Sequence, residues 1–242
     1  MIKQRLDKLM AQKGLAATRS EAESWIRLGR VTVDGKVVQK SGTFVAESAV
    51  VALEAPERYV SRAGLKLASV VAALNVDFKD KVVLDVGSST GGFTDYALQH
   101  GAKKVFAVDV GTDQLHPKLR GDNRVELYEK TDIRGFAPGA TPEVVVIDVS
   151  FVSLREILPS VAAMSGKATH IIAMVKPQFE AAKKQLGNSG VIKNDAVRRA
   201  ILKDFEQWAK QYFIVAGKAD SQVAGAHGNQ ERFYLLRKIS VK

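Results

Sequence analysis

The sequence predicts an α/β protein in which a small α+β domain precedes a larger domain built on a mostly parallel sheet. Two observations indicate the larger domain: five apolar runs alternate with segments long enough for helices, and the first run ends in a glycine-rich turn. A third observation indicates the boundary between the domains: Pro56 follows the end of the hydrophobic alternation at residues 44–53. We expect domains at residues 1–54 and 61–242, with a linker at 55–60.

The composition fits a globular protein with an anionic partner. The chain has 242 residues and a net charge of +10, which favours a polyanion. It has no cysteine and four scattered histidines, so we expect no disulfide and no metal. Neither an export signal nor an apolar run of about 20 residues is present. We expect a cytoplasmic monomer that does not enter a membrane.

The basic first domain is expected to fold as a helix followed by a tight hairpin. A turn of small residues precedes a helix over residues 20–28, and Gly29 ends it. The segments 31–33 and 36–38 flank the pair Asp34-Gly35, which is typical of a type I′ turn. Helical spacing groups cations on one side of this helix and turns Ala22 and Ile26 inward.

This segment resembles the alpha-L RNA-binding domain of a small-subunit ribosomal protein, pseudouridine synthases and tyrosyl-tRNA synthetases. The resemblance rests on Arg5-Leu6-Asp7, Thr18-Arg19-Ser20-Glu21-Ala22, Ile26 and residues 29–35, with Asp34 where asparagine is more usual. A solvated charged helix beside a hairpin is the alternative. The cations expected to contact RNA are Arg5, Lys8, Arg19, Arg27 and Arg30, together with Arg62 of the second domain.

The second domain is expected to open with an amphipathic helix over residues 62–74. The strand candidates that follow lie at residues 82–86, 104–109, 125–129, 144–148 and 170–174. After a polar helix at about 195–211, the runs 213–216 and 233–237 predict two antiparallel closing strands. The alternation indicates a parallel sheet with helices on both faces, finished by a hairpin.

The turn after the first strand predicts the ligand. Its glycines, Gly87, Gly91 and Gly92, do not have the spacing of a dinucleotide-binding turn, and no Gly-Lys-Ser/Thr sequence follows for a triphosphate. An Asp-x-Gly turn starting at Asp85 suits a ligand with an adenosine and a positive charge, which describes S-adenosylmethionine (SAM). The predicted doubly wound sheet, finished by a hairpin, resembles that of the Rossmann-like SAM-dependent methyltransferases. The alternative is an ordinary glycine-containing turn between a strand and a helix.

Acidic residues at the next strand ends extend the expected cofactor site. Asp109 is placed to accept both ribose hydroxyls, while Asp132 and Ile133 offer a carboxylate and an apolar face to adenine. Helix caps or solvated turns are the alternatives for both acids. The expected cofactor residues are Asp85, Gly87, Ser88, Ser89, Thr90, Gly91, Gly92, Phe93, Asp109, Val110, Asp132 and Ile133.

Charged residues also follow the fourth and fifth strands. Asp148 and Lys176 end nearly uninterrupted apolar runs, and buried charge is costly unless it is paired or used. A simple ion pair between them is the structural alternative. Lys66, in the first helix of the domain, and Glu231, before the last strand, are placed to reach the same rim.

Lys66, Asp148, Lys176 and Glu231 match, in this order, the catalytic tetrad of the FtsJ-like ribose 2′-O-methyltransferases. The whole chain resembles the TlyA family, often labelled hemolysin, which joins an alpha-L domain to such a methyltransferase. The matching segments are residues 59–67, 84–95, 107–111, 147–154, 175–180 and 228–231. Ala63 stands where glycine is more usual, and Tyr59 where longer relatives carry tryptophan.

The resemblance implies SAM-dependent 2′-O-methylation of a ribose in ribosomal RNA. Because the chain stops soon after its last strand, as in the shorter form of the family, we expect a cytidine of the large-subunit RNA as the target. Lys176 is the expected general base, activated by partial burial and by the charge of Lys66. Asp148 would orient that lysine, and Glu231 and Lys66 would hold the ribose.

Two other functions are open at this level. A non-catalytic RNA-binding or ribosome-assembly factor would need only the first domain. A membrane-lytic protein would need a spanning or strongly amphipathic apolar segment, which the sequence does not contain.

Overall fold

The computed structural model describes residues 3–16, 19–27, 29–53, 59–181, 192, 194–223 and 230–239. Contacts divide the chain into two units, Met1–Arg58 and Tyr59–Lys242, each with its own hydrophobic core. Tyr59, which the sequence places in the linker, is buried in the core of the second unit and lies 5.5 Å from the Tyr96 ring. Most of the expected linker, at 55–58, lies outside the described residues.

The first unit combines two helices with short strands. These elements are β1 (Lys3–Arg5), α1 (Leu6–Gln12), α2 (Arg19–Arg27), β2 (Val31–Val33), β3 (Lys36–Val37), β4 (Phe44–Ala46) and β5 (Val51–Leu53). The strands form an antiparallel pair, β1-β4, and a three-stranded sheet in the order β3-β2-β5. Leu6, Trp25 and Ile26 are buried between helices and strands.

The expected helix and hairpin of this unit are confirmed, and α1 is an addition. Gly29 has a positive φ of 69°, as a residue that ends a helix often does. Asp34 and Gly35 also have positive φ, which a type I′ turn requires at both central residues. The turn residues Ala17 and Thr18 lie outside the described residues.

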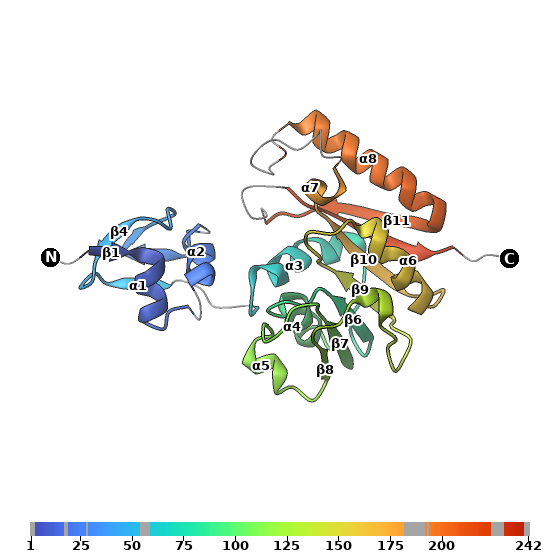
Figure 1. Ribbon diagram of the computed structural model, residues 1–242, viewed down its shortest axis with the longest axis horizontal. Coiled ribbons are helices and arrows are strands. Elements are labelled where there is room, and N and C mark those ends of the chain that lie inside the picture. The colour runs from blue at the N-terminus through green and yellow to red at the C-terminus, as the bar shows by residue number, and fades with distance from the viewer. Residues whose placement is uncertain are drawn as a thin grey trace. The chain divides into compact units, whose positions relative to one another are not determined.

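The second unit is built on one seven-stranded sheet in the order β11-β12-β10-β9-β6-β7-β8 (Figure 1). Its strands are β6 (Val82–Val86), β7 (Lys104–Val108), β8 (Val125–Tyr128), β9 (Val144–Ile147), β10 (His170–Val175), β11 (Phe213–Asp220) and β12 (Arg232–Lys238). Strands β6 to β10 pair in parallel, whereas β12 is antiparallel to β10 and to β11. The predicted fold class is confirmed.

Helices cover both faces of this sheet. They are α3 (Arg62–Leu74), α4 (Gly92–Gln99), α5 (Pro117–Arg120), α6 (Leu154–Met164), α7 (Pro177–Glu180) and α8 (Asp195–Tyr212), with a 3-10 turn η1 (Ile133–Gly135). Alternate residues of the central strands enter two different cores, because successive side chains of a strand point to opposite faces. One core contains residues of α3 and α4, and the other contains residues of α6 and α8.

The strand register brings the carboxyl ends of the parallel strands to one edge. Ile147 of β9 pairs with both Val86 and Ala173, so Asp148 follows directly at that edge. Val175 of β10 pairs with Arg232 of β12. The next residue along β10, Lys176, and the residue before β12, Glu231, are therefore neighbours at the same edge.

Candidate active site at the carboxyl edge of the sheet

The glycines of the turn after β6 have two different structural roles. Gly87 has a φ of 79°, and a Cβ there would lie 2.6 Å from the carbonyl oxygen of Asp148. A Cβ on Gly92 would lie 2.8 Å from the backbone nitrogen of Gly64, so this glycine lets α4 approach α3. A Cβ on Gly91 would meet the side chain of Leu119. Only Gly87 of the three borders the two cavities described below.

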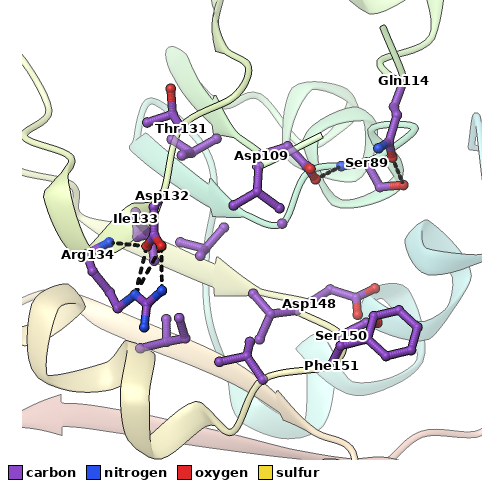
Figure 2. A pocket seen from close by; sticks show the side chains of 17 residues that line it. Ser89, Asp109, Gln114, Thr131, Asp132, Ile133, Arg134, Asp148, Ser150 and Phe151 are labelled. Carbon is purple, nitrogen blue, oxygen red and sulfur yellow. Dashed lines mark hydrogen bonds and ion pairs between the residues drawn. The ribbon is translucent and has the colours of Figure 1, made fainter. Parts of the chain in front are cut away.

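A cleft of about 450 Å³ opens beside Gly87 at the ends of β6, β7 and β9 (Figure 2). Six of the expected cofactor residues line it, namely Gly87, Ser89, Asp109, Val110, Asp132 and Ile133. The wall opposite Asp109 is formed by the segment Asp148–Phe151 that follows β9. Six residues that the sequence predicts to bind the cofactor therefore lie together at one cleft.

Two of the acids that line the cleft, Asp109 and Asp132, also have local structural partners. The carboxylate of Asp109 accepts hydrogen bonds from the backbone nitrogens of Ser89 at 2.8 Å and Gly111 at 2.6 Å. Asp132 caps η1 and forms a 2.6 Å ion pair with Arg134, whose hydrogen bonds lower the pKa of Asp132 to about 2. These contacts hold each carboxylate in a fixed position at the wall of the cleft.

A smaller cavity of about 150 Å³ lies between Asp85 and Lys176. It is lined by the expected residues Asp85, Gly87, Ser88, Ser89, Thr90 and Phe93, and also by Ser61, Ala63, Asp148, Ser150 and Lys176. Asp85 is buried, and one of its oxygens accepts a 2.6 Å hydrogen bond from Thr94 Oγ1. Within the described chain, its Oδ1 and the Ser88 Oγ have no hydrogen-bond partner. Burial raises the pKa of Asp85 to about 7.

The four expected catalytic residues form two ion pairs at the edge of the sheet. Lys176 Nζ lies 2.6 Å from Asp148 Oδ1 and donates a hydrogen bond to Ser150 Oγ at 2.7 Å. Lys66 Nζ, from α3, lies 2.6 Å from Glu231 Oε2. Each lysine side chain is only 11% exposed. The register places Lys176 beside Glu231, so the two pairs occupy adjacent strand ends.

Phe151 is a feature of this edge that sequence reasoning did not identify. Its side chain is 92% exposed, its φ is 66°, and its ring centroid lies 5.3 Å from that of Phe179. A positive φ is strained for a bulky residue, and an exposed aromatic ring is not stabilised by a core. Neither property has a signal in the local sequence, because a lone phenylalanine after a strand is more often buried.

The expected RNA-binding cations are in three different environments. Arg5 and Arg19 form ion pairs of 2.7 and 3.1 Å with Asp7, which is fully buried. Lys8 and Arg30 are exposed, while the side chain of Arg27 lies outside what the structure describes. Arg62 is the first residue of α3 in the second unit and is partly buried. Hydrogen bonds from Arg5 hold the pKa of Asp7 well below its usual range.

The described residues contain neither a membrane-spanning helix nor a metal-binding cluster. No helix in the described part of the chain is both long and apolar enough to span a bilayer. Likewise, no group of three or more histidine and acidic side chains among the described residues has the arrangement of a metal site.

A sheet of this order, with a cleft at the glycine turn and an antiparallel final hairpin, defines the Rossmann-like methyltransferase class. Comparison with family models agrees. Residues 59–238 match the FtsJ-like methyltransferase family, and residues 4–51 match the S4 domain. The chain belongs to the FtsJ-like methyltransferases, in the TlyA group that carries an S4 domain at the N-terminal side.

Named relatives cover most of the chain. It is 36% identical over 239 residues to the "16S/23S rRNA (cytidine-2'-O)-methyltransferase TlyA" of Mycobacterium tuberculosis, covering 96% of this chain and 89% of that protein. It is 41% identical over 187 residues to the "23S rRNA (cytidine-2'-O)-methyltransferase TlyA" of Campylobacter jejuni, covering 75% and 72%. A solved structure described as "Putative hemolysin from Streptococcus thermophilus" has a TM-score of 0.78 at 39% identity, covering 99% and 90%.

Proposed function

We propose that the protein transfers a methyl group from SAM to the 2′-hydroxyl of a ribose in ribosomal RNA, with a cytidine of the large-subunit RNA as the target. The observation that carries the proposal is the pair of Lys–acid contacts, the partly buried Lys176–Asp148 and the buried Lys66–Glu231, beside a cleft suited to SAM. The names of both methyltransferase relatives include 23S rRNA and cytidine, which supports the choice of target.

The residues of the two cavities fit SAM. Gly87 lets the turn at the wall of the cleft lie against the backbone of Asp148. Asp109 follows β7 where a ribose would meet it, and Ile133 adds an apolar surface for adenine. In the smaller cavity the unpartnered oxygens of Asp85 and Ser88 are suited to a ligand's ammonium group. A cation there would favour the charged form of Asp85 over the protonated form that burial favours.

Bound SAM supplies a methyl group on a positively charged sulfur, and the protein must align and deprotonate the ribose hydroxyl. Lys176 is the residue that we assign to accept that proton, a step that requires its amine to be neutral when the ribose hydroxyl arrives. Its amine is fixed by Asp148 and Ser150, at 2.6 and 2.7 Å, and Asp148 stabilises the positive charge that forms on the lysine. Because the amine of Lys176 is fixed in this way, the ribose hydroxyl that it deprotonates would attack the methyl group from one direction.

Lys66 and Glu231 are assigned to holding the ribose. Their 2.6 Å contact compensates the charge of Lys66, so this lysine acts on Lys176 less strongly than an unpaired cation would. A hydroxyl of the ribose that reaches this pair can donate to the carboxylate and accept from the ammonium. The exposed ring of Phe151 offers a stacking surface to a base that has left its own stack.

The second candidate is an RNA-binding assembly factor without catalysis. The first unit alone would support it, because its S4 domain presents exposed cations such as Lys8 and Arg30. The complete set of Lys66, Asp148, Lys176 and Glu231 favours catalysis, since a binding protein has no need of two enclosed lysines at a SAM-type cleft.

Mapping of ribose methylation tests the proposal directly. The purified protein would be incubated with SAM and with large subunits, small subunits or protein-free rRNA, and 2′-O-methyl groups mapped before and after. We expect one new 2′-O-methylated cytidine in large-subunit RNA. Methylation of a base, or SAM binding by calorimetry without transfer to any of these RNAs, would contradict the proposal. The second result would favour the assembly factor.

A further inference from the structure

The second unit carries a basic groove between α8 and the β11–β12 hairpin, here called the α8 groove. Its volume is about 390 Å³. Five cations line it: Arg199, Lys203 and Lys210 from α8, Lys218 from β11 and Arg232 from β12. Figure 1 shows α8 lying along these two strands at the end of the sheet that they form.

The three cations of α8 form a row. They are separated by four and seven residues, and these steps return to nearly the same side of a helix. At 1.5 Å per residue the row from Arg199 to Lys210 is about 16 Å long. The neighbouring side of α8 enters the core through Leu202 and Phe205, and Leu202 also lines the floor of the groove. The row is therefore held on one side, with a length that fits several consecutive phosphates of a nucleic acid strand.

Acidic groups compensate the groove only in part. Glu206 forms ion pairs with both Lys210, at 2.8 Å, and Lys218, at 2.9 Å. Because one carboxylate serves two lysines, one positive charge remains in excess. Arg199 and Lys203 form no ion pair with any residue that the structure describes, so the end of the groove near the start of α8 is the more positive one.

The groove reaches the catalytic edge through β12. Asp220, the last residue of β11, forms ion pairs with Arg232 and with Arg198 of α8, at 2.7 and 2.6 Å. Arg232 pairs in register with Val175, the residue before Lys176. Here too one carboxylate is shared by two cations. A strand of RNA with its target ribose at the catalytic edge would have neighbouring phosphates close to this end of the groove.

We propose that the α8 groove binds the phosphate backbone of the RNA substrate next to the nucleotide that is methylated. The proposal rests on the proposed function for the identity of the RNA. Phosphate is the fitting partner because the groove presents separated cations in a row and continues from the edge that would hold the ribose. An acidic protein segment would also be attracted by positive charge, but nothing requires it to lie beside the ribose.

The test compares two charge-reversal pairs. R199E/K203E alters the most positive end of the groove, and K79E/K167E is the matched control. Lys79 and Lys167 are exposed and precede β6 and β10, at the opposite edge of the sheet, so the net charge changes equally in both pairs. Binding to protein-free large-subunit rRNA and to whole large subunits would be measured over a range of salt concentrations, with SAM affinity measured by calorimetry.

We expect R199E/K203E to weaken RNA binding at low salt by about tenfold or more and to reduce the slope of log K against log salt by about one to two. The control should lose less than about threefold, and SAM affinity should not change in either pair. The milder pair R199Q/K203Q should shift the RNA affinity in the same direction. Equal melting temperatures would show that the fold is intact.

Three results would overturn the proposal: unchanged RNA affinity, an equal loss in both pairs, or a loss seen only with whole subunits. The last would mean that the groove contacts a ribosomal protein. These outcomes are separate from the proposed function. Wild-type protein that binds RNA through the groove but methylates no ribose would refute the activity alone.

Discussion

Two clusters of paired charges, one in each unit, differ in how far their cations are exposed. In the first unit the carboxylate of Asp7 is fully buried, while its partners Arg5 and Arg19 keep 39% and 54% of their side-chain surface exposed. At the catalytic edge the lysines themselves are enclosed, since Lys66 and Lys176 are each 11% exposed. Both clusters contain cations at short distances from acids, so distance alone does not distinguish them.

Exposure of the cation decides what each cluster can do. An arginine that is fixed by a buried acid and still faces water has donors left for a phosphate, and its side chain is already ordered. A lysine that is enclosed beside a cofactor cleft has lost much of its water, which is the setting of proton transfer. We therefore expect changes at the catalytic edge to affect turnover and changes around Asp7 to affect the stability of the first unit.

The largest expected effect tests Lys176 as a base. Lys176→Arg keeps a positive charge for Asp148, but a guanidinium is not deprotonated in proteins, so it cannot accept the ribose proton. We expect methyl transfer to fall by about 10³-fold. The affinities for SAM and RNA should stay close to those of the wild type. Tritium transfer in single turnovers and calorimetry would measure these quantities.

Two further variants complete this experiment. Lys176→Ala should lose as much activity as Lys176→Arg, whereas Lys167→Arg, an exposed lysine before β10, should have no effect. If Lys176→Arg retained a tenth or more of the wild-type rate, the residue would act as a fixed charge, and another group would have to remove the proton.

Most of the fold could be predicted because its signals are local. The strands β6 to β10 are apolar runs with boundaries set by polar or turn residues, and the structure matches the expected ranges to within a residue. The helix α1 was not expected, because Leu6–Gln12 is short and its stability depends on packing against the rest of the unit. The burial of Tyr59 has a similar explanation, since it depends on tertiary contacts within the second unit.

The site could be predicted as a set of residues but not as an arrangement. Strand ends bring Asp148 and Lys176 together, and their pairing follows from a parallel sheet. The contact of Lys66 with Glu231 joins positions 165 residues apart and has no local signal. The glycines of the turn also have different roles that the sequence does not distinguish: Gly87 borders the cleft, while Gly92 allows α4 to pack on α3. The assigned roles in binding and catalysis stay predictions.

A smaller effect is expected when the second pair of the catalytic edge is broken. Glu231→Ala leaves Lys66 enclosed without its partner, which should lower the free energy of unfolding of the second unit by about 3 kcal/mol. The double variant Lys66→Met/Glu231→Leu removes both charges and should regain most of that stability without regaining activity. Urea unfolding would be followed by the fluorescence of Trp208 in a Trp25→Phe background, because these are the two tryptophans of the chain.

If the double variant were as unstable as Glu231→Ala, the loss would come from packing and not from an uncompensated charge. If it were active, Lys66 and Glu231 would not hold the ribose. The two readouts, stability and turnover, therefore separate the structural part of this pair from its proposed part in the reaction.

The smallest effect is expected at Asp7, because its partners remain in water when the acid is removed. Asp7→Asn should lower the free energy of unfolding of the first unit by about 1–2 kcal/mol at pH 7. Hydrogen bonds from Arg5 hold the pKa of Asp7 below its value of ~3.9 in the unfolded chain, so its contribution is complete above about pH 4 and is lost as the pH falls toward the folded-state pKa. The difference between the wild type and the variant should therefore be largest at pH 7 and should shrink as the pH falls below about 4.

Trp25, which is buried in the first unit, reports this unfolding in a Trp208→Phe background. Glu47→Gln is the matched control, because Glu47 is an exposed acid of the same unit, and its removal should change stability by less than about 0.5 kcal/mol. A difference between Asp7→Asn and the wild type that persisted unchanged at about pH 2 would mean that the shape of the side chain, and not its charge, stabilises the unit. In that case only the catalytic edge would support the view that paired charges determine the properties of these two clusters.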